Sequence, residues 1–111
     1  MHTLTLYGKI GKFIIDVADV DYLKGDGNYT AIHLALGQSI MSAKTLSLFE
    51  EIPGFVRIHK GCLINVAYID HLHVVSPKEA FVVLKSGVKF AVSRRRIVHV
   101  SDQIRLSGKA K

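Results

Sequence analysis

The chain has 111 residues, 49% of them hydrophobic, which suffices for one core and predicts a single domain over residues 1–111. No apolar run approaches the roughly 18 residues of a membrane span, and the first residues lack the basic and long apolar regions of a signal peptide. The single cysteine, Cys62, excludes an intrachain disulfide and a cysteine-based zinc site, so we expect a cytoplasmic protein.

The net charge of +6 is unevenly distributed. Residues 1–53 carry four lysines against six acidic residues, whereas residues 54–111 carry eleven lysines and arginines against three acidic residues. Asymmetry of this size indicates a polyanionic partner, although it does not separate DNA from RNA or from an anionic membrane surface.

The first part of the chain is predicted to form short strands. Residues 3–7 and 12–16 have the pattern of a hairpin over residues 8–11, and residues 19–24 form a third strand. Residues 25–28 read Gly-Asp-Gly-Asn, a loop in which several residues can adopt positive φ. Residues 29–36 alternate between two faces, with Thr30, Ile32, Leu34 and Leu36 on one of them, and residues 39–42 form another strand.

Residues 44–52 are predicted to form the first helix. Leu46 and Phe49 lie on one face, Leu48 and Ile52 lie close to it, and Pro53-Gly54 ends it. Residues 55–58 return to extended chain. Residues 59–65 are ambiguous, and the glycine at position 61 favours a single helical turn over a long helix.

The second part continues the β pattern. Residues 67–75 form a strand, and residues 80–84 and 88–92 form a hairpin over residues 85–87; each of the two has four or five apolar residues, as expected of well-covered strands. A helix is predicted from residue 94 to about 105, with the apolar stripe Ile97, Val100 and Ile104. Residues 106–111 form a frayed tail. No internal repeat and no linker are evident, so we expect a mainly antiparallel β fold with one or two short helices.

The run Ser-Arg-Arg-Arg at 93–96 needs a physical reason. Ser93 is placed as the N-cap of the last helix, and Arg94, Arg95 and Arg96 then fall in a first turn that is already electropositive. A bound anion would account for them, because N–H groups, dipole and guanidinium groups would face one phosphate or base edge. The alternative is a solvated basic turn.

Several segments together resemble the LytTR DNA-binding domain. They are Asp-x-x-Tyr-Leu at 19–23, Gly-Asn-Tyr at 27–29, Phe-x-Arg-Ile-His-Lys-Gly-x-Leu-Ile-Asn at 55–65, Ile69, and Val-Ser-Arg-Arg at 92–95. The resemblance covers about residues 10–105. It implies an elongated set of small antiparallel sheets in a bacterial transcription regulator, whose loops enter successive major grooves of duplex DNA.

The resemblance also carries expectations about partners. Members often bind as pairs of protomers on direct repeats, and most carry a receiver domain before the DNA-binding part. No receiver-like segment stands before residue 10 of this sequence. A stand-alone regulator and an excised domain are both left open, and control by phosphorylation is not part of the prediction.

Three positions match the base-reading loops of the family. Asn28 can pair with an adenine edge, Lys60 can reach guanine acceptors or a phosphate, and Arg95 can fork onto guanine. The expected phosphate contacts are Ser93, Arg94, Arg96 and Lys44. The alternatives are a turn asparagine at 28 and a solvated lysine at 60.

The remaining polar residues favour structural roles. Arg57 is expected to pair within or beside the sheet, His59 to be hydrogen-bonded, and Asn65 to satisfy backbone groups in a turn. His71 and His73 have no third ligand at a recognisable spacing, and no catalytic or cofactor motif is present, so we expect neither an enzyme nor a metal site. The leading hypothesis is sequence-specific duplex DNA binding; the alternative is a β-rich interaction module for a protein or single-stranded RNA.

Overall fold

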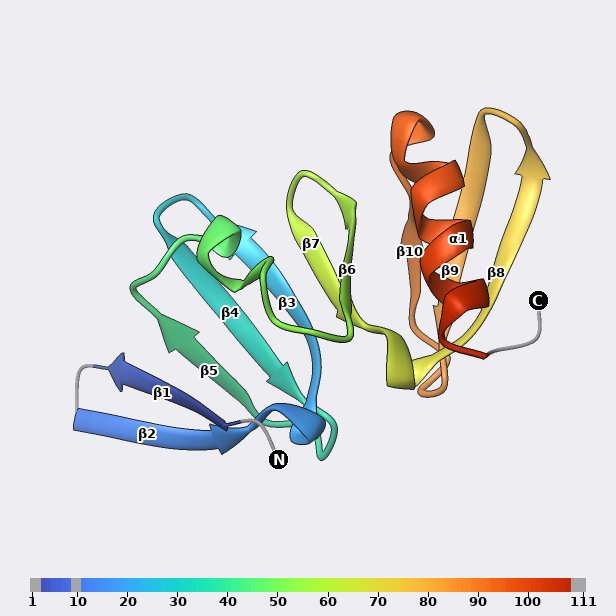
Figure 1. Cartoon of the computed structure of the whole chain (residues 1–111). Helices are drawn as coiled ribbons and strands as arrows, with labels where there is room; N and C mark the ends of the chain where they lie inside the picture. Colours follow the sequence, from blue (N-terminus) through green and yellow to red (C-terminus); the bar gives the residue numbers. More distant parts are fainter. Residues whose placement is uncertain (1–2, 9–10, 109–111) are drawn as a thin grey trace.

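The computed structural model describes residues 3–8 and 11–108 and contains three antiparallel sheets and one α-helix (Figure 1). The body is elongated, with extents of 45 × 28 × 23 Å. The expected mainly β fold of small antiparallel sheets is confirmed.

The three sheets follow one another along the chain. β1 (Thr3–Gly8) and β2 (Gly11–Asp16) form a hairpin at one end, as predicted. The central sheet has the order β5-β4-β3-β7-β6, from β3 (Val20–Asp26), β4 (Tyr29–Leu34), β5 (Ser39–Ser42), β6 (Phe55–His59) and β7 (Cys62–Asn65). The third sheet has the order β10-β9-β8, from β8 (Ile69–Ser76), β9 (Glu79–Leu84) and β10 (Lys89–Ala91). The helix α1 (Ile97–Leu106) ends the described chain.

Four short 3₁₀ turns connect these elements: η1 (Val17–Asp19), η2 (Leu46–Phe49), η3 (Val66–Tyr68) and η4 (Arg94–Arg96). η1 precedes β3 and η3 precedes β8; η2 follows β5 and η4 follows β10. The same series of turn, three strands and turn therefore occurs twice.

The strand registers show that this is an internal repeat, contrary to the expectation of none. β3 pairs with β4 through Leu23 and Ile32, and β8 pairs with β9 through Leu72 and Val82. Each first strand carries a bulge at the same place, between Val20 and Tyr22 and between Ile69 and His71. Equivalent residues are 49 positions apart in β3 and β8 and 50 apart in the following strands, because β8 has a second register shift at Val75.

The backbone hydrogen bonds of the two repeats also correspond. The amide of Leu34 donates to Gln38 over 2.8 Å, and the amide of Leu84 donates to Val88 over 2.9 Å. Both turns contain a glycine of positive φ, Gly37 at 101° and Gly87 at 93°, a conformation that side chains with a Cβ rarely adopt. The sequence did not reveal the repeat because few residue types recur at equivalent positions. What recurs is the burial pattern and the strand register, which only the structure shows.

The hairpin of β6 and β7 lies between the repeats and contributes to both of their cores. Phe55 and Leu63 pack in the core of the first repeat, whereas Ile58 and Ile64 pack in the core of the second. Side chains of a strand alternate between its two faces, so one hairpin can fill two cores. α1 covers the second core with Ile97, Val100 and Ile104, the stripe predicted from the sequence.

The predicted helix over residues 44–52 is wrong in length and type. Only η2 forms, and of the proposed face Leu46 and Phe49 are buried while Leu48 is exposed. Buried residues three positions apart suit a 3₁₀ turn, in which positions i and i+3 are aligned. The chain has left this turn before Pro53-Gly54, where Gly54 takes a φ of 86°.

Other boundaries differ because tertiary pairing decides them. Residues 59–65 form the tight end of a hairpin rather than a helical turn, since β6 and β7 pair directly. The strand predicted from residue 67 begins at Ile69, and the loop predicted at 25–28 shrinks to Gly27-Asn28. β10 spans three residues at a sheet edge and is largely exposed, so it is not the well-covered strand expected.

The chain ends differ slightly from expectation. Leu106 still belongs to α1, and residues 107–108 form a turn; residues 109–111 of the predicted tail, like residues 9–10 of the first hairpin loop, lie outside the described residues. No helix in the described part of the chain is long and apolar enough to cross a membrane.

Candidate nucleic-acid interface

Three turns that carry predicted contact residues lie on one edge of the molecule. β3 pairs with β7, and the amide of Gly25 donates to the carbonyl of Gly61 over 3.0 Å, which places the β3–β4 turn beside the β6–β7 turn. The amide of Ser93 donates to the carbonyl of Ile58 over 2.8 Å, which places η4 against the end of β6. Figure 1 shows the three turns along its upper edge.

The β3–β4 turn presents Asn28. Gly27 has a φ of 62°, which reverses the chain in two residues and leaves Asn28 exposed at the tip. Within residues 3–8 and 11–108, the side chain of Asn28 makes no hydrogen bond. Asn28 lies in the turn, as its alternative role requires, but its side-chain amide is not used there and remains available.

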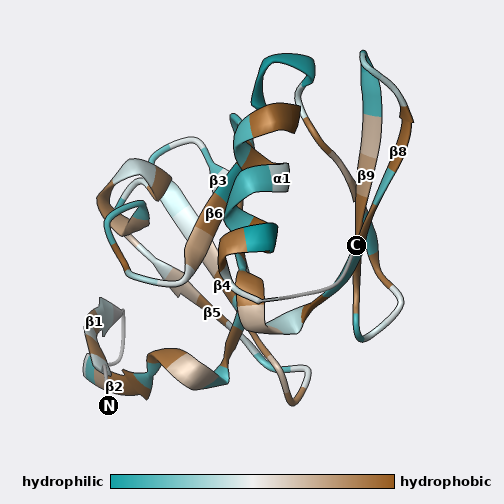
Figure 2. Cartoon of the chain, turned by 45° about the vertical axis from the view of Figure 1, so that its right-hand side comes forward, coloured by the Kyte–Doolittle hydropathy of each residue, from teal (hydrophilic) through white to brown (hydrophobic). Residues whose placement is uncertain are grey.

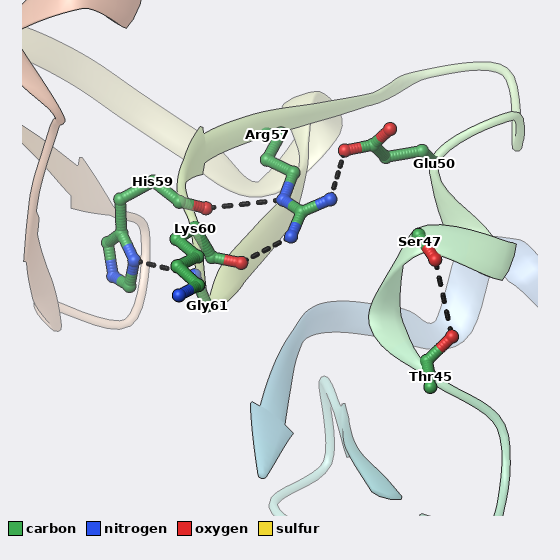
Figure 3. Close-up of polar contacts among 7 residues, drawn as sticks. All are labelled: Thr45, Ser47, Glu50, Arg57, His59, Lys60 and Gly61. Atoms are coloured by element: carbon green, nitrogen blue, oxygen red, sulfur yellow. Dashed lines mark hydrogen bonds and ion pairs between the residues drawn. The ribbon is translucent and has the colours of Figure 1, made fainter. Parts of the chain in front are cut away.

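The β6–β7 turn is held by Arg57 (Figure 3). The guanidinium of Arg57 pairs with the carboxylate of Glu50 and donates to the carbonyl oxygens of His59 and Lys60. Its side chain is only 18% exposed, which agrees with the structural role expected of it. Because Arg57 binds the backbone of Lys60, the exposed side chain of Lys60 projects from a fixed turn.

His59 makes a local bond and has positive neighbours. Its Nδ1 accepts the amide of Gly61 over 2.9 Å, as expected of a structural histidine. Burial lowers the pKa of His59 below its usual value, and the nearby charges lower it further, in the order Lys24, Arg96 and Arg57. The neutral ring therefore suits its role as an acceptor.

The arginine run differs from the prediction in its backbone. Arg94, Arg95 and Arg96 form a 3₁₀ turn, and α1 begins only at Ile97, so the arginines precede the α-helix rather than occupy its first turn. Ser93 makes no side-chain capping bond; its carbonyl accepts the amide of Arg96 over 2.8 Å. The backbone bond from Ser93 to Ile58 fixes the start of η4. The turn itself is closed by a backbone bond rather than by the serine hydroxyl.

The arginine side chains are free to meet a ligand. Arg94 and Arg95 are exposed and Arg96 is half-buried, and within the described ranges none of the three pairs with a carboxylate. Figure 2 shows this hydrophilic turn at the tip of α1, above the alternating hydrophobic bands of the helix.

Lys44 lies beyond β5, close to the same edge. The hydroxyl of Thr30, at the start of β4, donates to the carbonyl of Lys44 over 2.7 Å and holds this segment beside the β3–β4 turn. Lys44 itself is exposed.

A hollow of about 500 Å³ opens between this segment and the β6–β7 turn. Its wall includes Thr45, Ser47, Lys60 and the glycines Gly25, Gly27 and Gly61. Sequence reading missed Thr45 and Ser47, because one hydroxyl residue before a short helical segment and one inside it carry no distinctive spacing.

The other polar residues have structural partners. Asn65 donates from Nδ2 to the carbonyl of Val20 over 2.9 Å and accepts the amide of Ala67 over 3.0 Å, as expected. His71 pairs with Asp70 over 2.7 Å. Tyr22 stacks on His33 with ring centroids 4.4 Å apart, so it packs within the fold. Burial raises the pKa of Cys62 to about 12, which keeps it a thiol.

This combination of small β sheets with a basic edge of exposed turns defines a nucleic-acid-binding β domain. The sequence matches the family model of the LytTr DNA-binding domain over residues 11–105. The chain therefore belongs to the LytTR DNA-binding domain family, a family of DNA-binding transcription regulators rather than of enzymes.

Individual proteins are also similar to this chain. An uncharacterized response regulatory protein of Yersinia pestis is 26% identical over 94 residues, which cover 83% of this chain and 38% of that protein. The chain thus spans well under half the length of this curated relative. A solved structure, described as the LytTr DNA-binding domain of a methyl-accepting/DNA response regulator from Bacillus cereus, superposes with a TM-score of 0.78. It is 18% identical, and the match covers 94% of this chain and 97% of that one, so it shows the shared fold.

Proposed function

We propose that the chain binds duplex DNA sequence-specifically, with its edge turns inserted in the major groove, and thereby directs transcription regulation in the cytoplasm. The observation that carries the proposal is the shared edge, where two backbone bonds hold the turns of Asn28, Lys60 and Arg95 in one row. Turns held by sheet pairing keep their side chains in fixed relative positions, which base reading requires.

The shape of the molecule supports this arrangement. The body is 45 Å long, which exceeds the roughly 34 Å of one helical turn of DNA. A row of turns along such a body can reach successive major grooves on one side of the duplex. Each proposed side chain also has the chemistry for its base: an amide for adenine, an ammonium or guanidinium group for guanine.

The proposed roles divide between bases and phosphates. Asn28, Lys60 and Arg95 read base edges from the three turn tips. The sequence-independent contacts to phosphates come from Ser93, Arg94, Arg96 and Lys44. None of these side chains has a carboxylate partner in the described part of the chain, so their binding capacity is not used within the fold.

Selection of bound duplexes from a random pool tests the proposal. We expect one enriched sequence, and pairs of such sites about one helical turn apart would indicate two protomers on a direct repeat. Arg95→Ala should lose about 1–3 kcal/mol against the enriched duplex and relax one base position. An unchanged pool after selection, or preferential binding of single-stranded RNA in a parallel assay, would contradict the proposal.

A further inference from the structure

The hollow beside η2 lies between two of the turns that face DNA. One wall is the segment of Thr45 and Ser47, and the opposite wall is the β6–β7 turn with Lys60. Leu46 and Arg57 also line it, and Gly25, Gly27 and Gly61 contribute backbone without side chains. A Cβ at Gly25 would meet the side chain of Leu46 at 3.4 Å, so this part of the wall lies close to Leu46.

The hydroxyls of Thr45 and Ser47 provide donors to this hollow. Their oxygens are 3.2 Å apart, so one donates to the other (Figure 3). A hydroxyl has one proton, and the acceptor of the pair therefore retains its own O–H for an incoming oxygen atom.

The charge around the hollow favours an anion. Glu50 neutralises the guanidinium of Arg57, with which it forms an ion pair. Lys60 on the opposite wall and Lys44 beside Thr45 are exposed, and neither side chain has an ion-pair partner in the described ranges. Asp26, between Gly25 and Gly27, adds one negative charge, so the two lysines leave the local balance positive by one charge.

The internal repeat links this segment to the arginine turn. Residues 43–47 leave β5 as residues 93–97 leave β10, so Lys44 corresponds to Arg94 and Thr45 to Arg95. The second repeat presents long cationic side chains at this place. The first repeat presents Lys44 and, at Thr45 and Ser47, short hydroxyls, which a ligand reaches only by entering the hollow.

We propose that this hollow seats one backbone phosphate of the bound duplex, held by the hydroxyls of Thr45 and Ser47. The inference rests on the proposed function. The seat lies beside Lys60, and its phosphate contact adds affinity without reading sequence. Phosphate oxygens of DNA fit this site because they are negatively charged acceptors, and the hollow offers hydroxyl donors in a positive environment.

The test compares Ser47→Ala and Ser47→Asp with the matched pair Ser86→Ala and Ser86→Asp. Ser86 is exposed in the β9–β10 turn, at the edge opposite the DNA-facing turns in Figure 1. The probe is a labelled 30-base-pair duplex of random sequence and, separately, the selected duplex, with binding followed by fluorescence anisotropy. Circular dichroism establishes that each variant is folded.

We expect Ser47→Ala to weaken binding about three- to tenfold on both duplexes, as for one lost hydrogen bond, and to leave the base preference unchanged. Ser47→Asp should weaken it more than tenfold, because a carboxylate repels the phosphate. The Ser86 variants should bind like the wild-type chain. If both Ser47 variants bind like their Ser86 counterparts while the wild type still selects its duplex, the phosphate seat is wrong and the proposed function stands. If the wild type binds neither duplex, both are wrong.

Discussion

Arg57 donates a hydrogen bond to the backbone carbonyl of Lys60, three residues further along the chain. A half-buried guanidinium group thus fixes the turn from which an exposed lysine projects. The bond connects the sheet to the proposed DNA contact, because the position of Lys60 depends on Arg57, whose guanidinium is bonded within the fold.

Arg57→Gln should reveal two roles of this side chain, the stabilisation of the fold and the positioning of Lys60. It removes the pair with Glu50 and the bonds to two carbonyl oxygens, and we expect a loss of about 1–2 kcal/mol in the free energy of unfolding, measured by urea denaturation. The base preference at the Lys60 position should relax as well. Glu50→Gln is the control, since it removes only the exposed partner. Equal base preference in Arg57→Gln and wild type would contradict the positioning role.

The arginine turn should act through phosphate charge. Arg94→Gln and Arg96→Gln should each reduce the slope of log K against log salt by about 0.9, with little change in stability, because these side chains make no ion pair within the described chain. Arg105→Gln is the control; Arg105 pairs with Asp102 over 2.5 Å on α1, away from the edge. An unchanged salt slope would show that the turn is merely solvated.

Asn65 and Asp16 occupy equivalent positions in the two repeats. Exchanging amide for carboxylate at one and carboxylate for amide at the other should nevertheless change the free energy of unfolding by different amounts. Each caps a 3₁₀ turn, but only Asn65 is buried and donates across to Val20. Asn65→Asp should cost about 2–3 kcal/mol, because it buries a charge and leaves the carbonyl of Val20 without its donor. Asp16→Asn keeps its capping oxygen and should change stability by less than about 0.5 kcal/mol. Similar losses in both variants would contradict this assignment.

The shared hairpin should make the two cores unfold together. Leu63→Ala opens a cavity in the first core and Ile64→Ala in the second, and each should cost about 2–5 kcal/mol. Because β6 and β7 belong to both cores, circular dichroism and tyrosine fluorescence should give coincident denaturation curves in wild type and variants. Two separate transitions would show that the repeats fold independently.

Stability should decrease as the pH falls below about 6.5. Burial lowers the pKa of His59, and it also lowers that of His33, where Lys24 adds to the effect and Asp21 opposes it. The unfolded chain therefore binds these protons more readily, so the stability that the neutral rings contribute is complete above pH 6.5 and is lost below it.

Denaturation between pH 7.5 and about 5.5 measures this effect. His59→Gln should flatten the pH dependence, whereas His99→Gln, on the exposed face of α1, should preserve it. Burial raises the pKa of Asp21, which favours the folded state at low pH, but this contribution starts nearer pH 4 and has the opposite sign. A His59→Gln profile that matches the wild type would exclude His59 as a source.

Much of the fold was predictable because strand signals are local. The alternation of residues 29–34, the glycine of the β9–β10 turn and the stripe of Ile97, Val100 and Ile104 gave the right elements in the right order. The extents of η2, β7 and β10 were not predictable, since each depends on a neighbour distant in sequence. Arg57 and His59 could be assigned structural roles by residue type, but their partners were visible only in the fold.

The sequence by itself determined that the chain is a basic, mainly β protein of the LytTR kind, because residue spacing and net charge are properties of the chain in any conformation. Tertiary structure alone decided that Asn28, Lys60 and Arg95 share one edge. It also decided that Thr45 and Ser47 line a hollow between the turns, and that two dissimilar stretches form one repeat. These relations depend on which strands exchange hydrogen bonds, and that choice is made by packing between segments far apart in the chain.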